Sequence, residues 1–155
     1  MGSFDGSGYP PLYSNTSGQF NTAIGAGALP LNTTAPNNTA VGYQAGFSNT
    51  TGASSTLMGY QAGYSTTTNG QVVAFGHRAG YSNTALYFTG LGYLAGFSNT
   101  SGATTLAVGY QALYSNTTGS DNTAVGGYNA LYSNTTGANN VAVGREALQA
   151  NTTAS

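Results

Sequence analysis

Residues that could carry acid–base or metal chemistry are few and scattered along the chain. The charged residues are Asp5, Arg78, Asp121, Arg145 and Glu146, and His77 is the single histidine. No carboxylate or hydroxyl is placed by sequence to complete a catalytic triad with this histidine, and Arg145 and Glu146 are expected to form a surface pair. One histidine and three separated acids are too few for a closed metal site. The chain is therefore predicted to be non-enzymatic, with no catalytic, cofactor-binding or metal-binding residue.

One segment matches a nucleotide-binding pattern in form. Residues Gly90 to Ala95 read Gly-Leu-Gly-Tyr-Leu-Ala. A dinucleotide site needs this pattern between a strand and a long helix, with an acidic residue about twenty positions later. Neither the helix nor the acid follows here. The segment is interpreted as a repeat copy in which Gly90 replaces the usual alanine.

The elements that must position all of these residues are repeats. A glycine returns along the whole chain at a spacing close to seventeen, and it anchors each unit. The anchor glycines are Gly8, Gly25, Gly42, Gly59, Gly76, Gly92, Gly109, Gly126 and Gly144. Such self-similarity is typical of a solenoid whose units stack on one another. Helices are not expected, because no apolar period near 3.6 persists and each unit is interrupted by glycine or an Asn-Thr pair.

The columns of the repeat predict strand, core and turn. Three residues before the anchor glycine the chain usually has threonine or another β-branched residue, followed by alanine, which indicates a strand of about four residues. From Gly25 onward the position directly before the anchor glycine is apolar, and this aliphatic column is predicted to be the core. It consists of Ile24, Val41, Met58, Phe75, Leu91, Val108, Val125 and Val143. The Asn-Thr pair, often followed by Thr-Gly, predicts a turn that closes each coil.

An aromatic column is expected to form a ladder when the coils stack. It consists of Tyr13, Phe47, Tyr64, Tyr81, Phe97, Tyr114 and Tyr132, interrupted by Pro30 and Gln149. Together these patterns predict an all-β parallel solenoid of about nine 17-residue coils over residues 8–155, preceded by an extension over residues 1–7. A single coil buries too little apolar surface to fold alone, so neighbouring coils must stabilise one another.

Composition excludes several partners. The net charge is −1 and only 3% of the residues are charged, so no field attracts nucleic acid or an anionic membrane. The chain has no cysteine, and we see neither a signal peptide nor an apolar stretch long enough to span a membrane. Asn-x-Ser/Thr glycosylation motifs begin at Asn15, Asn32, Asn37, Asn49, Asn99, Asn116, Asn134 and Asn151. Turn chemistry already accounts for these Asn-Thr pairs.

Several units resemble known fibrous repeats. Asn38 to Gly42 and Asn122 to Gly126 read Asn-Thr-Ala-Val-Gly, and together with Asn21 to Gly25 they resemble head repeats of trimeric autotransporter adhesins. Tyr110 to Gly119 is similar to repeats in phage and bacterial tail-fibre-like proteins. The resemblance implies a left-handed β-roll that forms a homotrimer, with the aliphatic column inside each roll and alanine near the threefold axis. It also implies an extracellular or virion-surface location and a structural or adhesive fibre that acts as a spacer or receptor-binding rod.

Two sets of residues remain as binding candidates. The first set lies where the repeat is one residue shorter than usual. It is predicted to contact a cell-surface receptor, a glycan or another subunit, and it consists of His77, Arg78, Leu86, Tyr87 and Phe88. The second belongs to an alternative hypothesis, in which hydroxyl pairs on strands bind an ordered surface such as ice. That array comprises Ser48, Thr50, Ser65, Thr67, Ser82, Thr84, Ser98, Thr100, Ser115, Thr117, Ser133 and Thr135. End-to-end stacking into a filament made only of this chain is a further alternative.

Overall fold

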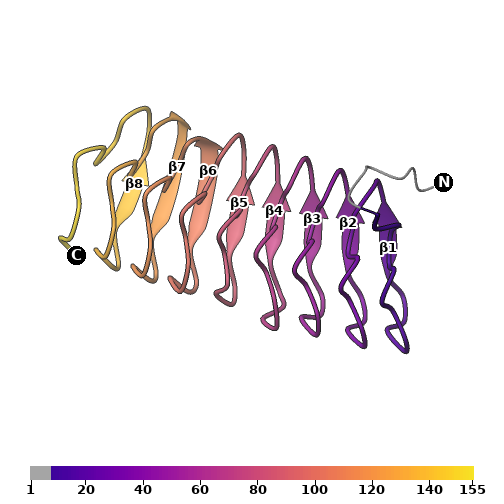
Figure 1. Ribbon diagram of the computed structural model, residues 1–155. Helices are drawn as coiled ribbons and strands as arrows, with labels where there is room; N and C mark the ends of the chain where they lie inside the picture. The colour runs from indigo at the N-terminus through magenta and orange to yellow at the C-terminus, as the bar shows by residue number, and fades with distance from the viewer. Residues whose placement is uncertain (1–7) are drawn as a thin grey trace.

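The chain folds into a rod of stacked coils with one strand per coil (Figure 1). The computed structural model describes residues 8–155, so the predicted extension over residues 1–7 lies outside the described part. The strands are β1 (Thr22–Ile24), β2 (Thr39–Val41), β3 (Thr56–Met58), β4 (Val73–Phe75), β5 (Thr89–Leu91), β6 (Leu106–Tyr110), β7 (Thr123–Tyr128) and β8 (Val141–Val143). Within residues 8–155 there is no helix. The predicted all-β parallel solenoid is confirmed.

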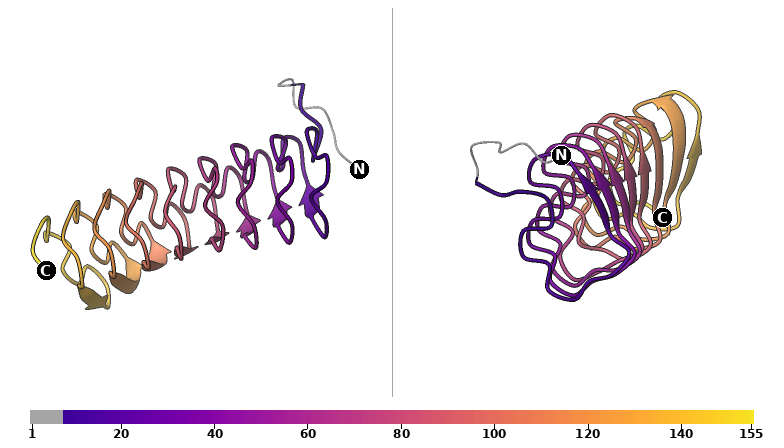
Figure 2. Two further views of the ribbon diagram at one scale, coloured as in Figure 1. Left: turned by 90° about the horizontal axis from the view of Figure 1, so that it is seen from below. Right: turned by 90° about the vertical axis from the view of Figure 1, so that its right-hand side faces the viewer.

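The eight strands form one parallel sheet in chain order along the rod (Figure 2). Each strand pairs with the equivalent residues of the next coil, as Thr39 does with Thr56 and Val41 with Met58. Eight strands with seven pairings define about seven turns, so the predicted count of nine was wrong. The count from anchor glycines included the unit at Gly8, which has no described strand. At about 4.8 Å per spacing, the seven pairings give a sheet about 34 Å long.

Glycine at the strand end is required by the close stacking of the coils. Gly59 has a φ of +132°, in the region that only glycine adopts without strain. A Cβ at Gly59 would also overlap the backbone carbonyl of Gly76 in the next coil. The one 18-residue unit adds Gly127 as a bulge, which shifts the register between β6 and β7. An added Cβ at this inserted glycine would meet nothing within 4 Å.

The core is formed by the middle residues of the strands and not by the predicted aliphatic column. The middle residue of each strand points into the coil, and Ala40, Ala74 and Ala107 are fully buried. The aliphatic column before the glycine points outward, with Ile24 55% exposed and Phe75 52% exposed. Its assignment to the core was therefore wrong, and so was the placement of the alanine column on a threefold axis. Adjacent residues of a strand face opposite sides, so a buried alanine places both of its neighbours outside.

The interior is narrow because the inward alanines lie against a second row of alanines in the same coils. This second row comprises Ala28, Ala45, Ala62, Ala79, Ala95, Ala112 and Ala130, all fully buried. Alanine on both walls leaves no room for an aliphatic column between them. The buried residues form two clusters along the rod, one from Ala28 to Phe88 and one from Ala95 to Ala142.

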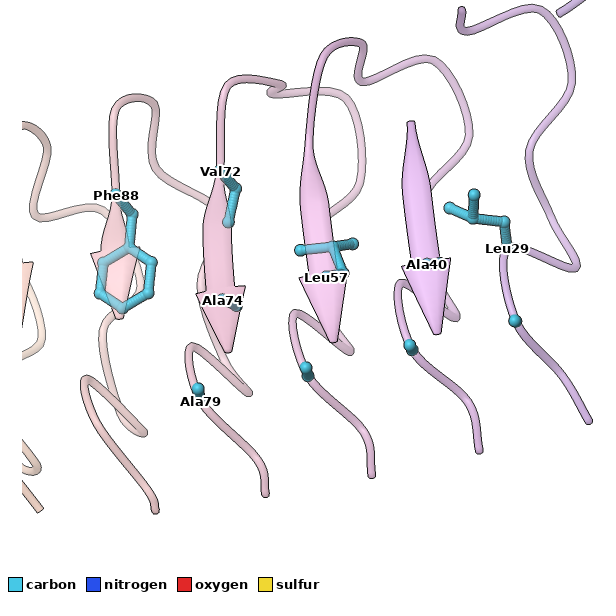
Figure 3. Packing of buried hydrophobic residues seen from close by; sticks show 10 residues of the cluster. Leu29, Ala40, Leu57, Val72, Ala74, Ala79 and Phe88 are labelled. Carbon is cyan, nitrogen blue, oxygen red and sulfur yellow. The ribbon is translucent and has the colours of Figure 1, made fainter. Parts of the chain in front are cut away.

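Two of the larger buried side chains, Leu57 and Phe88, occupy space that glycines leave open (Figure 3). A Cβ at Gly46 would lie 2.7 Å from Leu57 Cδ1, and a Cβ at Gly63 would also overlap this leucine. Phe88 fills the space that three glycines leave open, namely Gly80, Gly90 and Gly96. At these two levels, space in the core is thus shared between neighbouring coils.

The predicted Asn-Thr turns are confirmed, and their side chains bond from coil to coil. Asn116 Nδ2 donates to Asn99 Oδ1 at 2.8 Å and to the Gly119 carbonyl at 2.9 Å. Thr100 Oγ1 donates to the Thr117 carbonyl of the next coil at 2.8 Å. Five of the asparagines in this column that begin a glycosylation motif are buried, namely Asn32, Asn49, Asn99, Asn116 and Asn134. In the folded chain a glycan cannot be attached to these five, whereas Asn37 is exposed.

Candidate interaction faces

The outward side of the sheet forms a continuous uncharged strip along the rod. We call it the outer sheet face, and it consists of two columns. The first is Thr22, Thr39, Thr56, Val73, Thr89, Leu106, Thr123 and Val141, and the second is the aliphatic column from Ile24 to Val143. All of these side chains are partly or largely exposed. Contiguous exposed apolar side chains of this kind are found on many interaction surfaces.

The predicted aromatic ladder is present beside the sheet. Six rings from Phe47 to Tyr132 stack one above another, with centroids 5.0–5.3 Å apart and planes within 6–13° of parallel. Tyr13 does not continue this stack. It meets Tyr9 edge-on at 5.6 Å, because Pro30 occupies the ladder position in the coil between Tyr13 and Phe47.

A second ladder was missed from the sequence. Its members are Tyr43, Tyr60, His77, Tyr93, Tyr110 and Tyr128, with centroids 5.0–5.3 Å apart and planes within 4–18° of parallel. These residues follow the anchor glycine, Tyr128 after the inserted Gly127, so they border the outer sheet face at the carboxyl ends of the strands. The sequence signal was an aromatic or imidazole ring after the glycine in consecutive units.

His77 and Arg78 are integrated into these ladders. The His77 ring stacks between Tyr60 and Tyr93, at 5.0 and 5.1 Å. Arg78 Nε donates to Gln61 Oε1 at 2.8 Å, and its guanidinium carbon lies 5.6 Å from the centroid of the Tyr60 ring and 5.3 Å from that of Tyr81. The two side chains therefore join neighbouring coils, and Arg78 also links the two ladders.

The five residues predicted as one contact do not form a single site. His77 and Arg78 follow β4, whereas Leu86 and Tyr87 precede β5, so the two pairs lie at opposite ends of adjacent strands. Leu86 and Tyr87 are exposed, as a surface contact requires. Phe88 is only 1% exposed and packs in the core, so its assignment as a contact was wrong.

The predicted hydroxyl array lacks the strand geometry on which that hypothesis depended. All of its serines and threonines lie outside the strands. In five of the six pairs the threonine hydroxyl donates to a carbonyl of the next coil. These threonines are Thr50, Thr84, Thr100, Thr117 and Thr135. Their hydroxyl groups connect the coils to one another.

The described surface, over residues 8–155, has no pocket, and no three potential metal ligands lie together there. Gly90 to Ala95 forms the end of β5 and a turn, without the helix that a dinucleotide site needs. Arg145 Nη2 lies 3.6 Å from Glu146 Oε1 with both side chains exposed, as expected for a surface pair. None of the described segments is a helix able to cross a membrane.

Comparison with known proteins adds no family to this description. The chain matches no model of a protein family, no curated protein and no solved structure. Inferences about its function therefore depend on the faces described above.

Proposed function

We propose that this chain is a non-catalytic structural segment of a fibre, in which three copies pack side by side through their outer sheet faces. The observation that carries the proposal is the outer sheet face itself, an uncharged, partly apolar strip that runs the length of the rod. The four charged residues of the described part, Arg78, Asp121, Arg145 and Glu146, all lie off this face. Association through it would bury apolar side chains without burying an unpaired charge.

The length of the face sets the area that a small closed oligomer would bury. A face about 34 Å long and three residues wide, which is the length of most of the strands, covers roughly 340 Å². Three such faces would together bury on the order of 1,000 Å², which is comparable to the smallest specific protein interfaces. Cyclic closure also lets every copy use the same face, without leaving an apolar strip exposed.

The resemblance of the repeats to adhesin heads and tail-fibre-like proteins supports the same function. It implies left-handed winding of the coils and an extracellular or virion-surface location. In that setting the rod serves as a spacer, and the exposed residues outside the outer sheet face, including Leu86 and Tyr87, are available to a receptor or glycan.

Measurement of mass and shape in solution tests this proposal. Light scattering is expected to give three times the 15.5 kDa chain mass, and electron microscopy is expected to show a rod. Val125→Asp places a charge on the outer sheet face and is expected to reduce the mass to that of one chain while the β-sheet circular dichroism is retained. Thr118→Asp, on an exposed turn, is the matched control and should remain trimeric. A parent chain of single-chain mass would contradict the trimer.

A further inference from the structure

We propose that the second ladder is a site of oxidative crosslinking, where stacked tyrosines of adjacent coils become joined by dityrosine bonds. Three consecutive members carry this inference, namely Tyr93, Tyr110 and Tyr128, and we call them the tyrosine triplet. Their ring centroids lie 5.1 and 5.2 Å apart, with planes within 11° and 4° of parallel. The inference goes beyond the proposed fibre segment and does not depend on association between copies.

The triplet is bounded at both ends by side chains that are not phenols. The His77 ring stacks on Tyr93 at 5.1 Å. Arg145 follows the anchor glycine of the next coil, and its guanidinium carbon lies 5.6 Å from the centroid of the Tyr128 ring. Tyr110 is therefore the one member with a tyrosine on each side. A bond between neighbouring members of the triplet must include it.

Solvent reaches the phenols of the triplet. The three side chains are 40–44% exposed, whereas the stacked tyrosines of the ladder from Phe47 to Tyr132 are less exposed. Exposure admits an oxidant to the ring edge. It also leaves the rings room to tilt, which a bond between the edges of two stacked rings requires.

The reaction needs a one-electron oxidant, and hydrogen peroxide used by a haem peroxidase is the chemical class that suits exposed phenols. Two neighbouring phenols each lose one electron and the hydroxyl proton, which gives two phenoxyl radicals. One ring carbon beside the phenol oxygen (Cε) in each radical joins the other in a carbon–carbon bond. The hydrogen atoms of these two carbons then move to the oxygens and restore both phenols. The two hydrogen atoms lost in total reduce one peroxide to two water molecules.

Stacking favours coupling within one chain over coupling between chains. The fold holds the two radicals side by side, so each has a high effective concentration around the other. Tyr110 and Tyr128 stand opposite each other in the parallel sheet, at the register shift that the inserted Gly127 introduces. Tyr93 and Tyr128 are two coils apart, about 10 Å, which is too far for a direct bond.

Treatment of the purified chain with hydrogen peroxide and a haem peroxidase, at several protein concentrations, tests this inference. Dityrosine fluorescence measures the yield. Trypsin cleaves this sequence after Arg78 and Arg145, so the whole triplet lies in the fragment over residues 79–145. Mass spectrometry should find this fragment short of two hydrogen atoms, with the bond between Tyr110 and one of its neighbours. The oxidised chain should keep its single-chain mass on a denaturing gel, at a yield per chain that dilution does not change.

Tyr110→Phe is the decisive variant, because it keeps a stacking ring but removes the phenol that every bond in the triplet needs. Phe97 already stacks between tyrosines in the other ladder, so the coils should form as before. This variant should lose dityrosine at Tyr93 and Tyr128. Tyr87→Phe is the matched control, since Tyr87 is 56% exposed and belongs to neither ladder, and it should leave the bonds of the triplet unchanged. Circular dichroism checks that both variants are folded.

Other outcomes would overturn the inference. Bonds that form mainly between chains, with a yield that rises with concentration, would show that stacking does not direct the coupling. Preferential coupling of Tyr87 would show that exposure alone selects the residue. Absence of dityrosine from the triplet, or an unchanged yield there in Tyr110→Phe, would exclude the site. None of these results bears on the mass of the untreated chain in solution, so the proposed fibre segment is tested separately.

Discussion

The inner and outer faces of the sheet are built from alternate residues of the same strands, yet they accept side chains of very different size. The inner face has alanine in most coils, with Leu57 and Gly90 as its extremes. The outer face varies from Val41 to Phe75 within the same sheet. The inner side chains touch a second wall of the same coil, whereas the outer ones meet only what packs on the rod. Small size, more than hydrophobicity, thus distinguishes the inward residues of these strands.

The largest expected effect comes from a charge placed on one face or the other. Ala107→Asp puts an unpaired carboxylate in the fully buried wall, which costs several kcal/mol, and we expect no folded protein. Val108→Asp places the same group one residue later, on the outer face, and the coils should still form. Circular dichroism and thermal unfolding compare the two variants. Equal loss of structure in both would break the distinction between the faces.

Truncation of a large side chain sharpens the comparison. Leu57→Ala leaves a cavity beside Gly46 and Gly63 and should lower the free energy of unfolding by about 2–5 kcal/mol. Met58→Ala, the adjacent outward residue, should cost less than about 1 kcal/mol. Denaturant titration is best done in the Val125→Asp background, where the outer face is expected to remain in water. A larger loss for the methionine variant would reverse the two assignments.

A substitution in the asparagine column tests whether buried polar side chains stabilise the fold as the buried apolar ones do. Asn116→Ala removes bonds to Asn99 Oδ1 and to the Gly119 carbonyl, and it also leaves Asn134 without the acceptor Asn116 Oδ1. Loss of about 1–3 kcal/mol of stability is expected, because buried acceptors and donors stay unpaired. The matched control Thr118→Ala, on the exposed turn, should change stability by about 0.5 kcal/mol or less. Thermal unfolding of both variants measures the difference.

The smallest effect is expected from salt. The only ion pair in residues 8–155 joins Arg145 and Glu146 at the surface, and such pairs contribute about 0–1 kcal/mol. The unfolding midpoint should therefore hardly change between low and moderate sodium chloride, since there is little charge to screen. A large change in the unfolding midpoint would show that charged side chains contribute more to stability than their small number indicates. The same measurement of the unfolding midpoint against sodium chloride concentration, made on the Arg145→Ala variant, would then show whether this ion pair causes the shift.

The architecture was accessible from sequence because period and turn chemistry are local. The spacing of the anchor glycines predicted parallel stacking, and the Asn-Thr pairs predicted the turns. The direction of the strand side chains was not accessible from hydrophobicity, since alternation permits either face to be buried. A usable signal was present, because a close-packed core does not accept Val41, Met58 and Phe75 in successive coils without compensation. The pair of Leu57 and Gly46 displays such compensation, but it joins neighbouring coils and is therefore not visible within a single repeat.

The candidate contact residues were less predictable from the sequence, because their surroundings also come from neighbouring coils. Phe88 looked like a surface variant of a drifting unit, yet Gly80, Gly90 and Gly96 together create its buried site. His77 and Arg78 were correctly noted as unusual. The partners of the His77 ring, Tyr60 and Tyr93, each lie one unit away in the sequence, so a pattern within one unit does not indicate them.

The sharing of core volume between coils limits how this protein can change its length. A solenoid with identical repeats can gain or lose one unit without harm, whereas removal of the Phe88 coil would leave the space beside Gly80 and Gly96 empty. Duplication of that coil would instead bring a second phenylalanine into a wall already filled. The coils from Leu57 to Gly96 must therefore be inherited, recombined or engineered as one block, while the more uniform coils after them can be exchanged singly.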